Sequence, residues 1–235
     1  MRPRPDMRIN KFISETGVCS RRAADQWIEA GRISINGVTA TLGSKVEDGD
    51  QVLIDGQPIG AKKQHIYIAL NKPVGITCTT ERHIEGNIVD FVNHPERIFP
   101  IGRLDKDSEG LILLTNNGDI VNEILRVENA HEKEYIVTVD RPVTDIFLKG
   151  MASGVRILGT VTKPCTVTRI NPNTFRIVLT QGLNRQIRRM CTAFDYKVRR
   201  LQRVRIMHIQ LGDLQRGRWR TLTATELQKL GIQSS

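Results

Sequence analysis

The stretch GRLDKDSEGLILLTNNGD, residues 102–119, places three acidic side chains directly before an apolar run. Asp105, Asp107 and Glu109 fall in a segment bounded by glycines, and residues 111–114 read Leu-Ile-Leu-Leu. A short, continuous apolar run between turn signals is typical of a buried strand. The stretch therefore predicts a sheet with a buried strand that follows an acidic turn.

The acidic turn has three possible interpretations. Asp, Ser and Gly favour turns because the side chains bond to their own backbone, so the cluster can be a polar turn and nothing more. The spacing also matches the start of an EF-hand loop, but Asn116 would stand where calcium needs a bidentate Glu, and Pro100 and Gly102 disfavour an entering helix. We therefore exclude calcium. The third interpretation is a catalytic carboxylate on a loop that the following strand holds in place.

The composition excludes several classes of protein. With 235 residues, 39% hydrophobic and 26% charged, the chain is typical of a globular protein with one core, or a small domain and a larger one. It has no apolar run of the roughly 20 residues that span a bilayer and no apolar signal segment at its N-terminus. Its four cysteines form no CxxC pair, and its histidines form no HxxxH or HExxH motif. We expect a cytoplasmic protein that uses no metal and binds no membrane.

The formal net charge of +10 is concentrated in the last quarter of the chain. Residues 181–235 hold 12 Lys and Arg against three Asp and Glu, whereas residues 1–60 hold eight of each. A localised basic face favours a polyanionic partner, although a run of charge can also be an ordinary solvated surface.

Two adjacent segments carry much of this charge. NRQIRRMCTAF, residues 184–194, predicts a helix with one apolar face and with Arg185, Arg188 and Arg189 on another. The strand-like KVRRLQRVRI that follows holds four more arginines. A docked helix with solvated arginines would show the same pattern, but the planar fork of arginine suits phosphate and carboxylate groups, so we expect Arg185 and Arg189 to contact a polyanion such as a nucleic acid.

Two parts of the chain differ in pattern. Residues 7–55 predict two short helices, the second beginning after Ser20 and ending at Gly31, and then a hairpin with an Asn36-Gly37 turn. After a predicted linker at 56–64, residues 65–232 predict strands joined by hairpins and short helices. This pattern indicates an α+β protein whose larger domain is built on a mostly antiparallel, mixed sheet with flanking helices.

The first part resembles an S4 domain, an RNA-binding module. The resemblance lies in RINKFI, in CSRRAADQWIEAGRISING and in the Asn-Gly turn. It implies that basic side chains of the paired helices contact structured RNA, and in this sequence they are Arg8, Lys11, Arg21 and Arg22.

The second part resembles a pseudouridine synthase of the RsuA family, close to its RluF-like branch. LNKPVGI, IGRLDKDSEGLILLTNNGD, HEKEYIVTV and QGLNRQIRRM carry the resemblance, in the order found in the family. It implies that the enzyme breaks the N1–C1′ bond of a uridine, turns the uracil and joins C5 to C1′, without a cofactor. The expected partner is ribosomal RNA, with the large subunit favoured and a tRNA as a second substrate, and the protein is expected to be a monomer.

The same resemblance assigns roles to residues. It makes Asp105 the catalytic aspartate, Tyr135 the residue that stacks on the target base, and Arg188 the basic partner of the aspartate. Arg103 would support extrusion of the base, and Lys72 would shape the substrate pocket. Asp107 and Glu109 are then expected to be turn formers. Whether the aspartate attacks the sugar, attacks the base or removes a sugar proton stays open.

Two alternatives belong to other classes of function. A non-catalytic RNA-binding protein of the S4 type would need the first part and the basic surface, but no acidic residue between Arg103 and Leu111. An RNA base glycosylase would need an acid that activates water close to Asp105, and Asp107 is the only neighbour that could serve.

Overall fold

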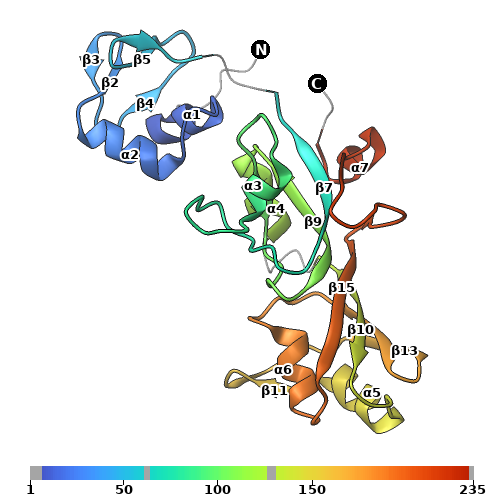
Figure 1. The fold of residues 1–235 in the computed structure, drawn as a ribbon. Coiled ribbons are helices and arrows are strands. Elements are labelled where there is room, and N and C mark those ends of the chain that lie inside the picture. Colours follow the sequence, from blue (N-terminus) through green and yellow to red (C-terminus); the bar gives the residue numbers. More distant parts are fainter. Residues whose placement is uncertain (1–6, 61–63, 126–130, 233–235) are drawn as a thin grey trace. The chain divides into compact units, whose positions relative to one another are not determined.

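The computed structural model describes residues 7–60, 64–125 and 131–232 (Figure 1). The chain forms two compact units: Met1–His65 with Asn116–Gly118, and Ile66–Thr115 with Asp119–Ser235. Among the described residues, every helix is too short or too polar to cross a membrane.

The N-terminal unit combines a helix pair with a small sheet. Its elements are β1 (Met7–Arg8), α1 (Ile9–Glu15), α2 (Arg21–Glu29), β2 (Ile33–Ile35), β3 (Val38–Thr39), β4 (Lys45–Val46), β5 (Val52–Ile54) and β6 (Gln57–Pro58). Four of the strands pair in the order β3-β2-β5-β6, and β1 pairs with β4. β6, which pairs with β5 at the edge of this sheet, falls within the segment 56–64 that we predicted to be a linker.

Local sequence signals explain these elements. The Ser20 side chain accepts a hydrogen bond from the Ala23 amide at 3.1 Å, which confirms the predicted helix cap. Asn36 and Gly37 have φ values of 51° and 82°, the left-handed conformation that a two-residue hairpin turn requires. Both helices pack their apolar faces on the sheet, so that Ile9, Ile13, Ala24, Ile28, Ile33 and Val52 belong to one buried cluster.

The larger unit is built on a nine-stranded mixed sheet. Its strands are β7 (Tyr67–Lys72), β8 (Phe99–Ile101), β9 (Glu109–Thr115), β10 (Lys133–Val139), β13 (Thr166–Asn171), β14 (Thr174–Leu179), β15 (Val198–Ile206), β16 (Ile209–Gln210) and β17 (Trp219–Thr221). The main order is β13-β14-β10-β15-β9-β7-β17, with β8 on β9 and β16 on β15. Only β15 and β9 pair in parallel among the described strands, which confirms the predicted mixed, mostly antiparallel sheet.

Short helices cover this sheet. They are α3 (Ile88–Val92), α4 (Gly118–Leu125), α5 (Asp145–Ser153), α6 (Gln186–Thr192) and α7 (Ala224–Lys229), and a separate ribbon is formed by β11 (Arg156–Ile157) and β12 (Thr160–Val161). Side chains cap two of these helices: Thr144 accepts from the Phe147 amide at the start of α5, and Thr223 and Glu226 form a capping box at the start of α7.

Strand β9 is buried on both of its faces. Leu111 and Leu113 belong to a cluster with residues of α4 and α7, whereas Ile112 and Leu114 belong to a cluster with residues of α3. Helices on both sides of a strand remove the usual alternation of apolar and polar residues, which explains the Leu-Ile-Leu-Leu run. The acidic turn is therefore attached directly to a strand fixed in the core.

The start of β9 is fixed by a close approach to β15. Gly110 pairs with Arg203, and a Cβ atom at Gly110 would lie 2.2 Å from the Arg203 carbonyl oxygen. Its φ of +105° also favours glycine. Glu109, which we expected in the turn, begins the strand instead, and its side chain is only 6% exposed beside Arg200 and Arg216.

Candidate active site

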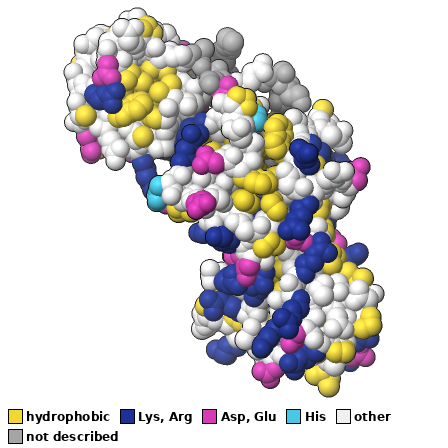
Figure 2. Space-filling model, viewed as in Figure 1, with side chains coloured by type: hydrophobic (Ala, Val, Ile, Leu, Met, Phe, Trp, Pro, Cys, Tyr) yellow, Lys and Arg dark blue, Asp and Glu magenta, His cyan; other side chains and the backbone are white. Residues whose placement is uncertain are grey.

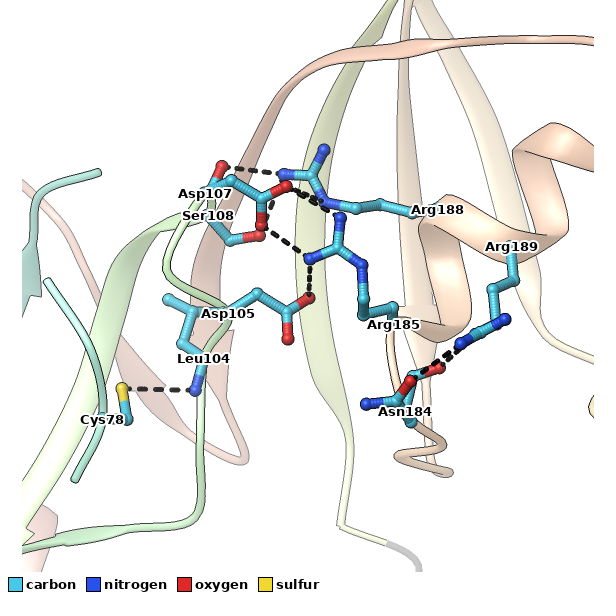
Figure 3. A network of polar contacts seen from close by, with 9 residues as sticks. All are labelled: Cys78, Leu104, Asp105, Asp107, Ser108, Asn184, Arg185, Arg188 and Arg189. Carbon is cyan, nitrogen blue, oxygen red and sulfur yellow. Dashed lines mark hydrogen bonds and ion pairs between the residues drawn. The ribbon is translucent and has the colours of Figure 1, made fainter. Parts of the chain in front are cut away.

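The acidic turn is held by backbone contacts on several sides. The Ser108 amide donates to the Asp105 carbonyl at 3.0 Å, and the Gly75 amide donates to the Lys106 carbonyl at 2.7 Å. The Leu104 amide donates to Cys78 Sγ at 3.4 Å (Figure 3). These contacts restrain the backbone on both sides of Asp105, whose side chain remains 34% exposed.

Arg185 is the residue directly before α6, and its side chain contacts the acidic turn. Its φ of 49° is left-handed, and its guanidinium forms two hydrogen bonds with the Asp107 carboxylate, at 2.9 and 2.8 Å. Its Nη1 also lies 3.7 Å from Asp105 Oδ2 (Figure 3). The Arg185 hydrogen bond, aided by the charge of Arg188, lowers the pKa of Asp107 below its usual value.

Arg188 contacts the turn at a different place from the one expected. Its Nη2 donates to the Asp107 carbonyl at 2.8 Å and to Ser108 Oγ at 3.1 Å, and its Nε lies 3.4 Å from Asp107 Oδ2. The ion pair with Asp105 that the resemblance assigned to Arg188 is formed by Arg185 in this structure. Arg185 precedes α6 and contacts the carboxylates of both Asp105 and Asp107, whereas Arg188 lies within the helix and contacts the Asp107 carbonyl and Ser108 Oγ.

Arg189 points away from this network. It is exposed, and its guanidinium donates to the Asn184 carbonyl at 3.1 Å and to Asn184 Oδ1 at 3.0 Å (Figure 3). Adjacent helical residues lie about 100° apart, so Arg188 and Arg189 cannot share an environment. The inward Arg188 side chain is only 15% exposed.

A cavity of about 580 Å³ opens beside Asp105. Its wall includes five of the residues singled out from the sequence, namely Arg103, Asp105, Tyr135, Arg185 and Arg188. These residues come from the turn, from β10 and from the segment around α6, and the sheet brings them together. Figure 2 shows dark-blue Lys and Arg side chains gathered over the region that Figure 1 labels α6 and β15.

Lys72, which we expected to shape the substrate pocket, is not among the residues that line this cavity. Its side chain is fully buried, and its ammonium donates to the carbonyls of Pro73 at 3.0 Å and Ile76 at 2.9 Å. Burial lowers the pKa of this amine. Lys72 therefore fixes the backbone of the segment after β7.

The sequence reasoning missed Arg203, which also lines the cavity. It is 4% exposed, its Nε donates to the Leu111 carbonyl at 2.7 Å, and its guanidinium carbon lies 6.0 Å from the centre of the Tyr135 ring. In the sequence it stands as one of four arginines in the basic segment 197–206, with no motif that sets it apart. Its position two residues after the buried Leu201 was the available signal, because alternate strand residues share a face.

The basic residues expected to contact RNA in the N-terminal unit lie on or near its surface. Arg8, Arg21 and Arg22 are exposed. Lys11 is partly exposed, and its ammonium lies 3.7 Å from Glu15 Oε1. Arg21 also lies near Asn10, with Nη2 at 3.5 Å from Oδ1.

The side chains of this site fit few kinds of chemistry. Across the described ranges, no group of three or more His, Cys, Asp and Glu side chains could hold a metal ion. Asp107 is held by two arginines and is poorly placed to activate water, whereas Asp105 is partly exposed at the cavity and has one long ion pair. The site therefore offers one available carboxylate, that of Asp105, among several cations. This arrangement suits a reaction on a bound nucleotide that needs no second acid.

An α+β fold, a carboxylate on a braced turn and a basic cavity fit an enzyme that acts on nucleic acid. Residues 66–193 match the family model described as RNA pseudouridylate synthase, and residues 7–52 match the S4 domain. The chain belongs to the RNA pseudouridine synthase family. It is an isomerase that converts uridine in RNA to pseudouridine, and it carries an S4 RNA-binding domain.

Individual relatives agree with this assignment. Over 229 residues the chain is 58% identical to the dual-specificity RNA pseudouridine synthase RluF of Escherichia coli strain K12, covering 97% of this chain and 79% of the relative. It is 32% identical over 232 residues to ribosomal large subunit pseudouridine synthase B of Bacillus subtilis, covering 95% of each. A crystal structure of a pseudouridylate synthase matches with a TM-score of 0.70 at 28% identity, covering 95% of this chain and 99% of that one.

Proposed function

We propose that this enzyme modifies a uridine of large-subunit ribosomal RNA, with a tRNA as a second substrate. One relative is named a large-subunit enzyme, and another is named dual-specificity. The observation that carries the catalytic part of the proposal is the partly exposed Asp105 carboxylate, which lines the cavity on a turn braced by β9. A short turn on a fixed strand limits the freedom of a reactive group.

Asp105 is the catalytic residue of this proposal. Arg185, 3.7 Å away, supplies its positive partner, and Arg188 is a positioning residue that holds the turn through Asp107 and Ser108. Tyr135, which also lines the cavity, stacks on the extruded uracil. Arg103 is exposed at the cavity and supports extrusion of the base, a step that costs a few kcal/mol of unstacking.

The two parts of the chain have different roles in this proposal. We assign RNA binding to residues 7–55, through Arg8, Lys11, Arg21 and Arg22, and catalysis to residues 65–232. Arg185 and Arg189 add contacts to phosphate near the cavity. The enzyme acts as a monomer in the cytoplasm, where its RNA substrates are found.

Pseudouridine mapping of total RNA tests the substrate directly. RNA from cells with the gene, without it, and with an Asp105→Asn copy would be compared position by position. We expect one or more sites in large-subunit RNA, and a site in tRNA, to require the gene and to stay unmodified with Asp105→Asn. Sites found only in small-subunit RNA would contradict the substrate assignment, and modification by Asp105→Asn would contradict the catalytic one.

The products formed in vitro separate the two alternative functions. Unmodified ribosomal RNA incubated with the purified enzyme should yield pseudouridine and no free uracil. A base glycosylase would release uracil, and a binding protein would leave the RNA unchanged.

A further inference from the structure

Arg203 carries an unmet hydrogen-bond donor beside the cavity. The residue is 4% exposed and lines the cavity, and its Nη2 atom is buried without a hydrogen-bond partner among the described residues. A buried donor that makes no hydrogen bond costs roughly 1–3 kcal/mol and more when it is charged, so such groups are rare outside functional sites. We propose that Arg203 binds the target base, by donating from this guanidinium to a carbonyl oxygen of uracil.

The guanidinium is fixed before any ligand arrives. Its Nε donates to the Leu111 carbonyl at 2.7 Å, and its Nη1 lies 3.5 Å from the Arg103 carbonyl, so it touches the chain on both sides of Asp105. The backbone of Arg203 approaches Gly110 so closely that only glycine fits there. A donor held in this way loses little entropy when it binds and reorganises little during the reaction.

The burial of the Arg203 side chain favours a contact with the base rather than with a phosphate. Arg103 and Arg185 are exposed where they line the cavity, whereas Arg203 is only 4% exposed in its wall. An extruded nucleotide inserts its base furthest, and Arg203 lies next to Tyr135, where the base is proposed to stack. The assignment rests on the proposed function in this respect.

A second cation strengthens the positive field on this wall. Lys133 lines the same cavity, and its ammonium donates to the His131 carbonyl at 3.3 Å. Burial lowers the pKa of Lys133, and the charge of Arg203 lowers it further. Neither cation forms an ion pair with a carboxylate in the described part of the chain, so both can act on negative charge that develops in a ligand.

Isomerisation develops such charge on the base. When the N1–C1′ bond breaks, its electron pair stays on uracil and spreads onto O2 and O4; attack of a carboxylate on the ring also places charge on a carbonyl oxygen. The C5–C1′ bond then forms, C5 loses a proton and N1 gains one, so that the atoms balance. A donor to that oxygen is most effective in the transition state, and its loss should slow conversion more than it weakens RNA binding.

The contact between Arg203 and the uracil oxygen can be tested by a double-mutant cycle, in which the protein and the substrate are changed singly and together. Arg203→Gln and Arg203→Lys would be compared with the wild-type enzyme in single-turnover reactions, on RNAs whose mapped target is uridine, 2-thiouridine or 4-thiouridine. Loss of one such donor typically slows a reaction about 10²- to 10³-fold, and we expect this for Arg203→Gln on uridine. Sulfur is a weak acceptor, so the variant should lose much less on the analogue that lacks the contacted oxygen.

Arg205→Lys is the matched control. Arg205 lies on the same strand, but it pairs with Glu132 and Glu134 and does not line the cavity. We expect it to shift stability without changing the ratio of rates between the three RNAs. Equal losses for Arg203→Gln on all three RNAs would overturn the proposal, since the residue would then act only by holding the turn.

The wild-type enzyme provides a readout if the Arg203 variants fail to fold. It should convert one thio-substituted RNA at least tenfold more slowly than the uridine RNA, and equal rates on all three would overturn the contact. Conversion of the uridine RNA itself reports on the proposed function, so failure of the contact and failure of the function are distinguishable.

Discussion

Asp105 and Asp107 show how two identical side chains in one turn acquire different roles. Asp107 receives two hydrogen bonds from Arg185 and lies 3.4 Å from Arg188 Nε, so it anchors the turn to the segment around α6. Asp105 has one ion pair at 3.7 Å and lines the cavity. The anchored carboxylate thus positions the available one.

Arg188 and Arg189 provide a test of this arrangement. We expect Arg188→Ala to lower turnover about 10²-fold at saturating RNA, because small misplacements of a reactive group can have effects of that size. Arg189→Ala should keep turnover but weaken binding, and reduce the slope of log affinity against log salt by about one. Single-turnover kinetics at several salt concentrations measures both. Equal turnover defects would mean that Arg188 does not hold the turn.

How far a residue's place in the site could be predicted depends on whether its contacts are near or distant in the sequence. Asp105, Tyr135 and Arg103 stand in local motifs, and the structure places all three at one cavity. The partners of Arg185 and Arg188 lie 78 to 81 residues away, so their choice between Asp105 and Asp107 depends on tertiary geometry that no local motif contains. The burial of Lys72 and Arg203 likewise follows from the sheet order.

At the scale of elements, the parallel contact between β9 and β15 positions the site. We expect Gly110→Ala to destabilise the larger unit by roughly 3 kcal/mol or more, because Gly110 has a φ of +105° and a Cβ would clash with the Arg203 backbone. Gly118→Ala is the control, since its Cβ would meet nothing within 4 Å. Urea unfolding measures both, and equal stabilities would show that β15 can move away from β9 at little cost.

Helix α7 offers a pH-dependent test. Glu226 accepts from Arg220 at 2.7 and 2.8 Å and from the Thr223 amide at 2.8 Å, and the pKa of Glu226 falls from 4.5 to about 2, chiefly because of Arg220. A lowered pKa means that its stabilisation is complete above about 4.5 and is lost as pH falls toward 2. Glu226→Gln should lower the free energy of unfolding by about 1 kcal/mol at pH 7. In urea unfolding the deficit should shrink below pH 4.5; a constant deficit would contradict this role.

Most elements could be predicted, but their pairing could not. Caps at Ser20, Thr144 and Thr223 are short-range hydrogen bonds that leave a clear pattern in the sequence. The parallel register of Arg203 with Gly110 joins segments about 90 residues apart and leaves only an isolated glycine as its signal. The short strand β6 could not be predicted, because the Gly-Gln-Pro sequence at 56–58 is also typical of a loop.

At the scale of the molecule, the two units have separate cores. The buried cluster of the N-terminal unit draws only on residues 9–59, and the three clusters of the larger unit draw only on residues 66–232. We expect a chain without residues 1–60 to fold and keep its catalytic chemistry, while RNA affinity falls on the order of 10²-fold because one of two linked binding elements is lost. Calorimetry and RNA titration measure these effects. Aggregation of the truncated chain would argue that the units depend on each other.

The basic last quarter is only partly free to bind RNA. Arg200 pairs with Glu109, Arg205 with Glu132 and Glu134, and Arg220 with Glu226. A charge count along the sequence cannot show these pairs, because most of the acids come from earlier segments of the chain. The exposed Arg189, whose guanidinium contacts Asn184 rather than a carboxylate, remains the better candidate for a phosphate contact near the cavity.

The most direct test of the central claim compares Asp105→Asn with Asp107→Asn on the mapped RNA. The assay is formation of pseudouridine in a single turnover with enzyme in excess, alongside RNA affinity and thermal unfolding for each variant. Asp105→Asn should form no detectable pseudouridine and bind RNA as the wild-type enzyme does, because the swap is nearly isosteric. Asp107→Asn should remain active but slower, with a lower unfolding temperature. Turnover by Asp105→Asn near the wild-type rate, or complete loss in both variants, would contradict the assignment of a single catalytic carboxylate.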